Sequence, residues 1–582
     1  MGMHLRGKGK IKCNRSSTPR QRWGAWQIKK RTAIPPTAGS LQEKEDPMKG
    51  FSYSMIVFLF FYFCGFCFNA FGATGDIEKQ FPSPASCPTG LAFDGKYLWN
   101  CDRKTDLIYK INPKDGGVVD SISSPGFRPV GLTWDGKTLW NLDVEENLIF
   151  QIDVKSGIAL KTLSAPCQTP QGLAWDGKYL WIADDAKNEI DQISTEDGTT
   201  ITTIPAPSFN PCGLAYDGKY LWVSDRISNM IYMITPDRGD VILFFDAPGP
   251  YAYGLAWDGK NLWNVDYQTD QIYKLKIFDD QTFSRTDEKQ EVLEYTHQFR
   301  NYGPGTIKDL DIYLAVPENL NNQELISEIQ YTPKPSEFLT DKWGQKVAHY
   351  KFQDLKSTQF VSVGMKVKAK LFKNRYYIFP EKVGRLADIP QSIRERYLVD
   401  DAKYSLTDHF IQESARKAVG NETNPYWIAR NIFNYVIEHM EYELAGGWNI
   451  APAVLKRGTG SCSEYSFVYI ALCRASGLPA RYVGSVVIRG DDASEDDVFH
   501  RWVEVYLPNY GWIPVDPSGG DSPSPAGQAS AFGNLNNRYL ITTTSGGGSE
   551  YLEWTYNSNE KWTSQGKCKV YAEHIGEWSP LK

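Results

Sequence analysis

A repeat of 41 residues dominates the first half of the chain and constrains its fold more than any other feature. Five glycines recur at this interval, namely Gly90, Gly131, Gly172, Gly213 and Gly254. Five tryptophans do the same, namely Trp99, Trp140, Trp181, Trp222 and Trp263. Each copy reads G-L-x-[FWY]-D-G-K-x-L-W-x-x-D. Asp-Gly between two apolar runs is a strong β-hairpin signal, so every copy is expected to begin with a hairpin.

Two more strands follow the hairpin in each copy, as at 107–111 and 118–122 in the first. Four short strands in a repeat of about 40 residues are typical of a propeller blade. The sequence therefore predicts a five-bladed β-propeller over residues 76–280. Its repeat style resembles glutaminyl-cyclase and NHL/YVTN-type propellers, but no catalytic motif of those families carries over. The variable loops between the fixed positions suit a protein or glycan ligand.

Each copy of the motif ends in an aspartate, at Asp102, Asp143, Asp184, Asp225 and Asp266. We interpret these side chains as caps that accept hydrogen bonds from their own turns. A ring of carboxylates that binds a cation is the alternative. The repeated tryptophans are expected to pack between blades, because a large flat side chain buries much area.

The N-terminal 75 residues differ in charge from the rest of the chain. Residues 1–50 carry 12 Lys and Arg against 3 Asp and Glu, which is +9, so the remainder carries −15 of a net −6. An uncharged apolar run at 51–72 follows Lys49 and ends in small residues. This pattern is typical of a signal peptide, with a retained anchor as the alternative, and it predicts export to the periplasm or the medium. Met48 is a possible second start, which would leave 1–47 untranslated.

The acidic body of the chain argues against a nucleic-acid partner. Seven cysteines follow the expected cleavage point, namely Cys87, Cys101, Cys167, Cys212, Cys462, Cys473 and Cys568. These seven form no CxxC pair, so neither a zinc ribbon nor another cofactor is indicated. An odd number leaves at least one thiol free in a monomer, although the four in the first half could pair in an oxidising compartment.

A separate β domain is predicted over residues 281–394, where the repeat is absent. Apolar and polar residues alternate there, most clearly at 361–371, as in a half-buried antiparallel strand. Two further alternating segments flank an expected turn at 301–305. We predict an immunoglobulin-like β-sandwich that acts as a spacer or docking domain. His297 and His349 have no ligand-like spacing and are interpreted as ordinary sheet residues.

A Gly-rich turn in the last domain, 395–582, leads to Cys462 at the start of an apolar helix. Gly477 and Pro479 end this helix. A thiol at a helix N-terminus has a lowered pKa, because the free backbone N–H groups favour the thiolate. The same N–H groups could stabilise an oxyanion on a carbonyl under attack. Cys473 lies deeper in the helix and is interpreted as a core residue.

A candidate base and a candidate acid follow on two segments that alternate like strands. His500 begins the first segment, and Asp516 ends the second. Adjacent antiparallel strands would place the two side chains together. This arrangement suits a Cys–His–Asp relay, in which the histidine takes the thiol proton and the aspartate fixes its tautomer. The alternative for His500 alone is a structural histidine.

Four motifs occur in order between positions 458 and 517: G-T-G-S-C-S-E-Y, R-A-S-G-L-P-A-R, H-R-W-V-E-V-Y-L-P and G-W-I-P-V-D-P. They resemble the transglutaminase-like core of the papain-like cysteine superfamily. The resemblance implies an α+β domain with Cys462 as nucleophile, His500 as general base and acid, and Asp516 as third member. It also places Trp448 where animal transglutaminases carry an indole that supports the oxyanion, with an ordinary packed tryptophan as the alternative. The chain shows no calcium-loop pattern, so calcium dependence is not expected.

These three residues imply a thioester acyl-enzyme formed on a protein or peptide substrate. Water as acceptor gives a protease or amidase, and an amine gives a cross-linking transglutaminase. Hydrolysis is favoured, because exported bacterial-looking members of the family are mainly hydrolases and water is abundant. A non-catalytic interaction scaffold remains the other alternative, since most of the chain is propeller and sandwich and a fold does not fix a function.

Overall fold

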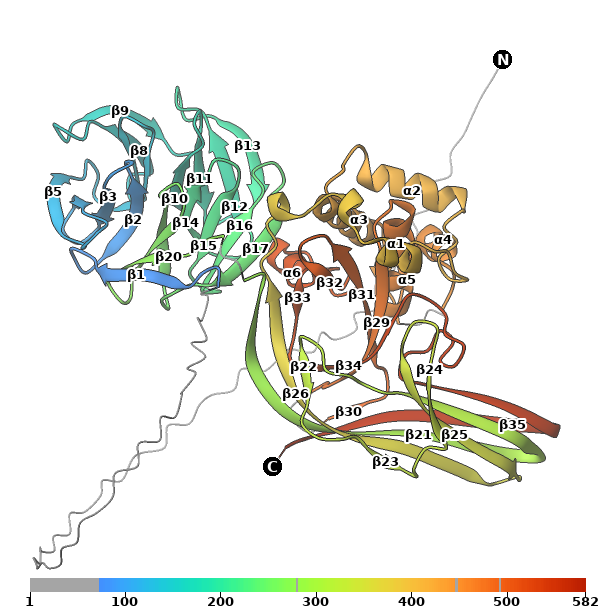
Figure 1. Ribbon diagram of the computed structural model, residues 1–582. Coiled ribbons are helices and arrows are strands. Elements are labelled where there is room, and N and C mark those ends of the chain that lie inside the picture. The colour runs from blue at the N-terminus through green and yellow to red at the C-terminus, as the bar shows by residue number, and fades with distance from the viewer. Residues whose placement is uncertain (1–72, 279–280, 445–447, 491–493, 582) are drawn as a thin grey trace, which may run out of the picture. The chain divides into compact units, whose positions relative to one another are not determined.

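A computed structural model describes residues 73–278, 281–444, 448–490 and 494–581 (Figure 1). The predicted signal peptide lies outside these ranges. Within them, no helix combines the length and the apolar character needed to cross a membrane. The seven cysteines of these ranges are all unbridged, so the possible pairing in the first half is not formed.

The first domain consists of five four-stranded antiparallel sheets, one for each sequence repeat. The first four contain, in order, β2 (Pro88–Phe93), β3 (Leu98–Asp102), β4 (Leu107–Ile111) and β5 (Val118–Ser123); β6 (Pro129–Trp134), β7 (Leu139–Asp143), β8 (Leu148–Ile152) and β9 (Ala159–Ser164); β10 (Pro170–Trp175), β11 (Leu180–Asp184), β12 (Glu189–Ile193) and β13 (Thr200–Pro205); and β14 (Pro211–Tyr216), β15 (Leu221–Asp225), β16 (Met230–Ile234) and β17 (Val241–Asp246). The fifth contains β18 (Ala252–Trp257), β19 (Leu262–Asp266), β20 (Gln271–Leu275) and the N-terminal strand β1 (Ile77–Pro82), which pairs with β20.

The five sheets form a closed ring, as a propeller requires. The first strand of each repeat contacts its counterpart in the next, and β18 contacts β2. Close approach explains the repeated glycine, because a Cβ on Gly213 would lie 2.2 Å from the carbonyl oxygen of Tyr253 in the next blade. The predicted β-propeller is therefore confirmed.

The repeated polar residues hold the blades in shape. The indole N–H of each repeated tryptophan donates to the aspartate of its own Asp-Gly turn, at 2.8–2.9 Å. Trp222 also stacks on Trp257 of the next blade, with ring centroids 6.3 Å apart. Asp225 is buried and accepts hydrogen bonds from the backbone N–H groups of Asn210 and Ser228, both at 2.7 Å. The other four motif aspartates accept comparable backbone bonds, which supports the capping interpretation over a cation site.

The middle domain is built on one hydrogen-bonded sheet with two very long strands. Its strands are β21 (Phe283–Ala315), β22 (Gln323–Leu325), β23 (Gln330–Thr332), β24 (Glu337–Thr340), β25 (Lys346–Leu355), β26 (Phe360–Tyr376), β30 (Glu495–Asp496), β33 (Asn534–Leu535) and β35 (Ser558–Pro580). The first half of β21 pairs with β26 and the second half with β25, while β35 follows both halves on the other edge (Figure 1). The C-terminal residues of the chain thus belong to this sheet.

The long sheet folds back on itself. The Tyr295 hydroxyl lies 2.7 Å from Ser558 Oγ, although Ser558 is paired with Leu314. On a straight strand Tyr295 and Leu314 would be roughly 60 Å apart, at about 3.3 Å per residue. The two halves therefore face each other, and the register shifts between Asn301 and Asp309 mark the bend.

The immunoglobulin-like sandwich expected for this domain is not confirmed. The segment 301–305 is part of β21, not a loop between two separate strands. The layers are joined by strands that continue from one to the other, because β21 and β35 bend together and keep their mutual hydrogen bonds.

The C-terminal domain packs helices against a small antiparallel sheet (Figure 1). Its helices are α1 (Gln391–Tyr397), α2 (His409–Val419), α3 (Pro425–His439), α4 (Ala451–Arg457), α5 (Cys462–Ala475) and α6 (Pro525–Ser530). Short elements are the 3-10 turns Pro380–Lys382 and Leu386–Asp388 and the paired strands β27 (Glu441–Tyr442) and β28 (Thr459–Gly460). The sheet order is β32 (Gly511–Val515), β31 (His500–Leu507), β29 (Ala480–Val487) and β34 (Tyr539–Ser545). Helix α5 is buried along almost its whole length and packs on β29 and β31, so its N-terminus is held rigidly.

Candidate active site

Cys462 is the first residue of α5, as the sequence predicts. Ser461 is the N-cap residue of α5, and its backbone N–H donates to the Glu464 carboxylate at 3.3 Å. The buried Glu464 carboxylate also accepts hydrogen bonds from Arg457 at 2.8 Å and from the Asn449 backbone at 3.1 Å. These contacts fix the turn that presents the thiol.

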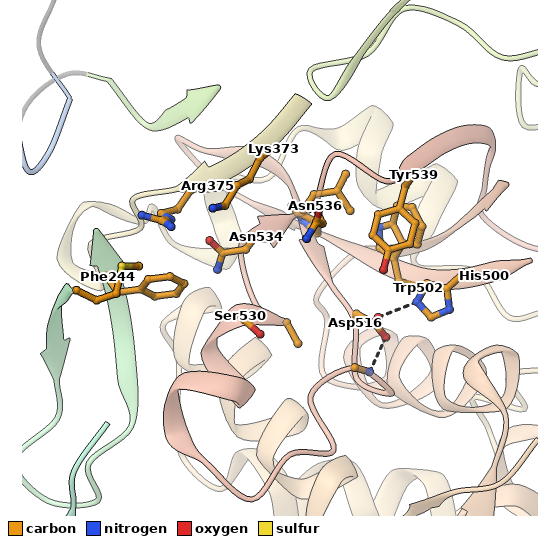
Figure 2. Close-up of a pocket in the computed structure, with 15 residues that line it drawn as sticks. Phe244, Lys373, Arg375, His500, Trp502, Asp516, Ser530, Asn534, Asn536 and Tyr539 are labelled. Atoms are coloured by element: carbon orange, nitrogen blue, oxygen red, sulfur yellow. Dashed lines mark hydrogen bonds and ion pairs between the residues drawn. The ribbon is translucent and has the colours of Figure 1, made fainter. Parts of the chain in front are cut away.

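His500 and Asp516 meet at one edge of β31 and β32. Val503 pairs with Val515, so the register places Asp516 beside the start of β31. His500 Nε2 lies 2.8 Å from Asp516 Oδ2 (Figure 2). Asp516 Oδ1 accepts further hydrogen bonds from the Ser518 hydroxyl at 2.8 Å and the Gly519 N–H at 2.9 Å. Because Nε2 is engaged by the aspartate, Nδ1 is the ring nitrogen left for the thiol.

The electrostatics of the three groups favour a thiolate–imidazolium pair. Burial by itself raises the pKa of the Cys462 thiol, but a hydrogen bond from His500, the charge of His500 and the Arg501 N–H outweigh burial and lower that pKa. Burial by itself lowers the pKa of His500, but Asp516 and Cys462 outweigh it and raise that pKa well above its ordinary value. Burial raises the pKa of Asp516, but His500 and the Gly519 N–H outweigh it, so the pKa is lowered and the carboxylate stays ionised. The fully buried Cys473 has a raised pKa, as a core thiol should.

Trp448, the candidate oxyanion residue, is 38% exposed. Its ring is 6.3 Å from that of Tyr556 and 5.2 Å from the Arg501 guanidinium.

Sequence reasoning missed Tyr556. Its phenol is buried, and its pKa is raised by burial first and then by the charge of Cys462. The Tyr556 side chain is therefore a neutral O–H donor within the electrostatic reach of Cys462, and it lies beyond every motif that could have indicated it.

A cavity of about 410 Å³ adjoins the His500–Asp516 pair (Figure 2). The C-terminal domain, β26 and the propeller all contribute side chains to its lining, among them Met230, Phe244, Lys373, Arg375, Trp502 and Tyr539. Figure 2 shows Lys373 and Arg375 on the far side of the cavity from His500. Arg375 is 3.2 Å from Asp246 and lies over the Phe244 ring at 4.6 Å. The cavity therefore has cationic side chains at one end, and aromatic side chains line it beside the candidate base, His500.

Comparison with known proteins identifies the class of the last domain. Residues 412–517 match the model of the Transglutaminase-like superfamily, so this part of the chain is a transglutaminase-like domain. An uncharacterized protein of Haemophilus influenzae is 28% identical over 152 residues, or 22% of this chain and 41% of that protein. The uncharacterized protein YebA of Bacillus subtilis is 28% identical over 165 residues, or 26% of this chain and 21% of that protein. The chain thus spans less than half the length of either relative.

Two solved structures are similar to parts of the chain. A proposed cysteine protease from Cytophaga hutchinsonii aligns with 51% of this chain and 100% of its own, at 14% identity and a TM-score of 0.37. The glutaminyl cyclase of Myxococcus xanthus aligns with 35% of this chain and 97% of its own, at 15% identity and a TM-score of 0.32.

Proposed function

We propose that this protein is an exported cysteine hydrolase that cleaves peptide or amide bonds through a thioester acyl-enzyme. The proposal rests on the arrangement of three side chains, those of Cys462, His500 and Asp516. Cys462 lies at the N-terminus of α5, His500 outweighs burial to lower the pKa of its thiol, and His500 is bonded to Asp516 at 2.8 Å. A nucleophile, a base in reach of it and an acid that orients the base are what thiol catalysis requires.

In the proposed reaction the Cys462 thiolate attacks the carbonyl carbon of the substrate. When the C–N bond breaks, the His500 imidazolium gives its proton to the leaving amine, and a thioester to Cys462 remains. Water then attacks the thioester carbonyl while His500 takes a proton from it. The thiolate leaves, the acid product is released, and the imidazolium is restored. Asp516 stabilises the charged imidazole throughout.

The oxyanion formed in both attacks needs donors close to Cys462. Backbone N–H groups at the start of α5 are one source, and the Tyr556 hydroxyl is a second. The Trp448 indole, implied by the family resemblance, is a third candidate, and its ring adjoins that of Tyr556.

The oxyanion role predicts different effects at two neighbouring positions. Tyr556→Phe removes one O–H and keeps the ring, so we expect kcat to fall about 10–100-fold with little change in KM, because the lost bond forms only in the transition state. Trp448→Phe is the comparison, since it removes the indole N–H and keeps an aromatic ring. Steady-state kinetics of both variants decide between the donors. If kcat is unchanged in Tyr556→Phe but falls in Trp448→Phe, the oxyanion donor is Trp448 instead of Tyr556.

Peptides or proteins are the proposed substrates, and two features support this. The cavity beside His500 offers aromatic side chains and the cations Lys373 and Arg375, which suit an acidic peptide segment. The propeller presents five non-identical sets of loops, which suit a protein or glycan ligand that brings the substrate to the site. The basic leader and the apolar run at 51–72 support export, with cleavage or retention as an anchor.

A paired assay tests the reaction. The full chain is incubated with acidic peptides and a labelled primary amine, and the released product and incorporated label are both measured. Release without incorporation, abolished in Cys462→Ala, supports hydrolysis. Incorporation exceeding release would assign amine transfer instead. If neither product forms, and Cys462→Ala leaves the phenotype of the source cell unchanged, the result favours a non-catalytic interaction scaffold.

A further inference from the structure

Three side chains that are far apart in the sequence converge between the two layers of the middle domain. His297 on β21 pairs directly with His574 on β35, and their ring centroids are 4.3 Å apart. Glu560, on the other half of β35, reaches both rings because the long sheet folds back. Its Oε2 lies 3.6 Å from His297 Nε2 and 3.8 Å from His574 Nε2. The three candidate ligand atoms all lie within 4.8 Å of one another.

Both imidazoles leave a nitrogen without a hydrogen bond at this point. The His297 side chain is fully buried, and neither its Nε2 nor the buried Nε2 of His574 has a hydrogen-bond partner among the described residues. Leaving a buried polar group unpaired costs about 1–3 kcal/mol, so two such atoms facing one carboxylate call for an explanation. The other nitrogen of His297, Nδ1, is 3.0 Å from Ser558 Oγ. This contact holds the ring with Nε2 toward Glu560.

We propose that His297, Glu560 and His574 bind a Zn²⁺ ion through two imidazole nitrogens and one carboxylate oxygen, with water as the fourth ligand. Two histidines and one carboxylate are a donor set that zinc accepts in tetrahedral geometry. Small side-chain movements bring the three atoms within zinc-ligand distance of a common point. Ser558 acts as the outer-sphere partner that ligating histidines require.

The position of the site indicates a structural role. An ion there would link β21 to both halves of β35 and so fasten the two layers together. Ser558 also meets the Tyr295 hydroxyl, and the Tyr295 ring is 5.9 Å from that of Phe499, the residue before His500. Zinc would therefore stabilise the domain against which the start of β31 rests. It takes no part in the thiol chemistry, so the proposal stands without the hydrolase.

Metal binding to the full chain tests the site. Zn²⁺ content after equilibrium dialysis should be one equivalent, and Co²⁺ should give the visible d–d absorption of a tetrahedral site. Glu560→Gln and His574→Gln are suitable variants, because both side chains are partly exposed and the fold should survive. Each substitution should lower the affinity for Zn²⁺ by at least about 10–100-fold, because the loss of an outer-sphere partner alone has an effect of this size. Zn²⁺ should raise the Tm of the wild type but not that of these two variants.

Glu337→Gln is the matched control, since Glu337 bonds to a different histidine of the same domain. His349 contacts Glu337 through Nδ1 and Asp311 through Nε2, so its partners lie on opposite sides of the ring and cannot converge on one ion. This variant should bind Zn²⁺ like the wild type. The proposal is overturned if folded wild-type protein, checked by circular dichroism, binds no stoichiometric metal. It is also overturned if Glu560→Gln and His574→Gln bind as tightly as the control.

Discussion

Replacing Cys462 with alanine is expected to lower kcat for amide hydrolysis by roughly 10⁴–10⁶-fold, the range seen when the nucleophile of a catalytic triad is removed. The remaining groups can still bind substrate, so KM should change little. The helix start should persist, because the Glu464 carboxylate holds this turn through Ser461, Arg457 and Asn449 without the thiol. Steady-state assays of the wild type and the variant measure the loss.

A second readout separates loss of the nucleophile from loss of the fold. In the wild type a small electrophile should label Cys462 selectively, as mapped by mass spectrometry, because its pKa is lowered while that of the buried Cys473 is raised. Cys568→Ser is the matched control, since Cys568 lies half-buried in the middle domain and should be dispensable. Equal activity in Cys462→Ala and Cys568→Ser would remove Cys462 from the mechanism.

Replacing Asp516 with asparagine should lower kcat/KM by roughly 10²–10⁴-fold, because the imidazolium loses the carboxylate that stabilises and orients it. The pH profile should change as well. In the wild type the active ion pair forms as pH rises through the lowered pKa of Cys462, and it is lost as pH rises through the raised pKa of His500. The profile is therefore bell-shaped. Without the Asp516 charge the pKa of His500 falls, so the alkaline limb should move to lower pH.

Asp521→Asn provides the control for this prediction. Asp521 is also a carboxylate of the C-terminal domain, but it accepts hydrogen bonds from Tyr465 and from the Tyr442 backbone instead of from His500. Its pH profile should match the wild type. An alkaline limb that stays in place in Asp516→Asn, measured by kcat/KM or by the rate of alkylation, would contradict the assigned orienting role.

Local patterns in the sequence predict much of this molecule. The propeller follows from a period of 41 residues, because each blade depends mainly on its own hairpins. The bond from His500 to Asp516 follows from two short strands separated by a turn, where the register is set locally. The helix that begins at Cys462 follows from its cap and its apolar run.

The features that sequence reasoning missed depend on contacts between distant segments. Tyr556 packs against Trp448 and Arg501 from a segment with no regular pattern. His297 has no ligand-like neighbour in the sequence, and it meets Glu560 only because β21 and β35 bend together. The sequence indicates a turn at 301–305, but nothing in it indicates that β35 bends at the same place and brings Glu560 to His297.

The pairing of β35 with β21 has a consequence for synthesis of the chain. Strand β35 (Ser558–Pro580) completes a sheet that begins much earlier in the chain, at Phe283. Until β35 has been synthesised, the long edge of β21 is unpaired, and an exposed strand edge invites aggregation. The transglutaminase-like domain is inserted between the two parts of this sheet, so it can fold while the sheet still waits for its final strand. The middle domain should therefore become resistant to proteolysis later than the transglutaminase-like domain during biosynthesis, and its folding should depend more on chaperones.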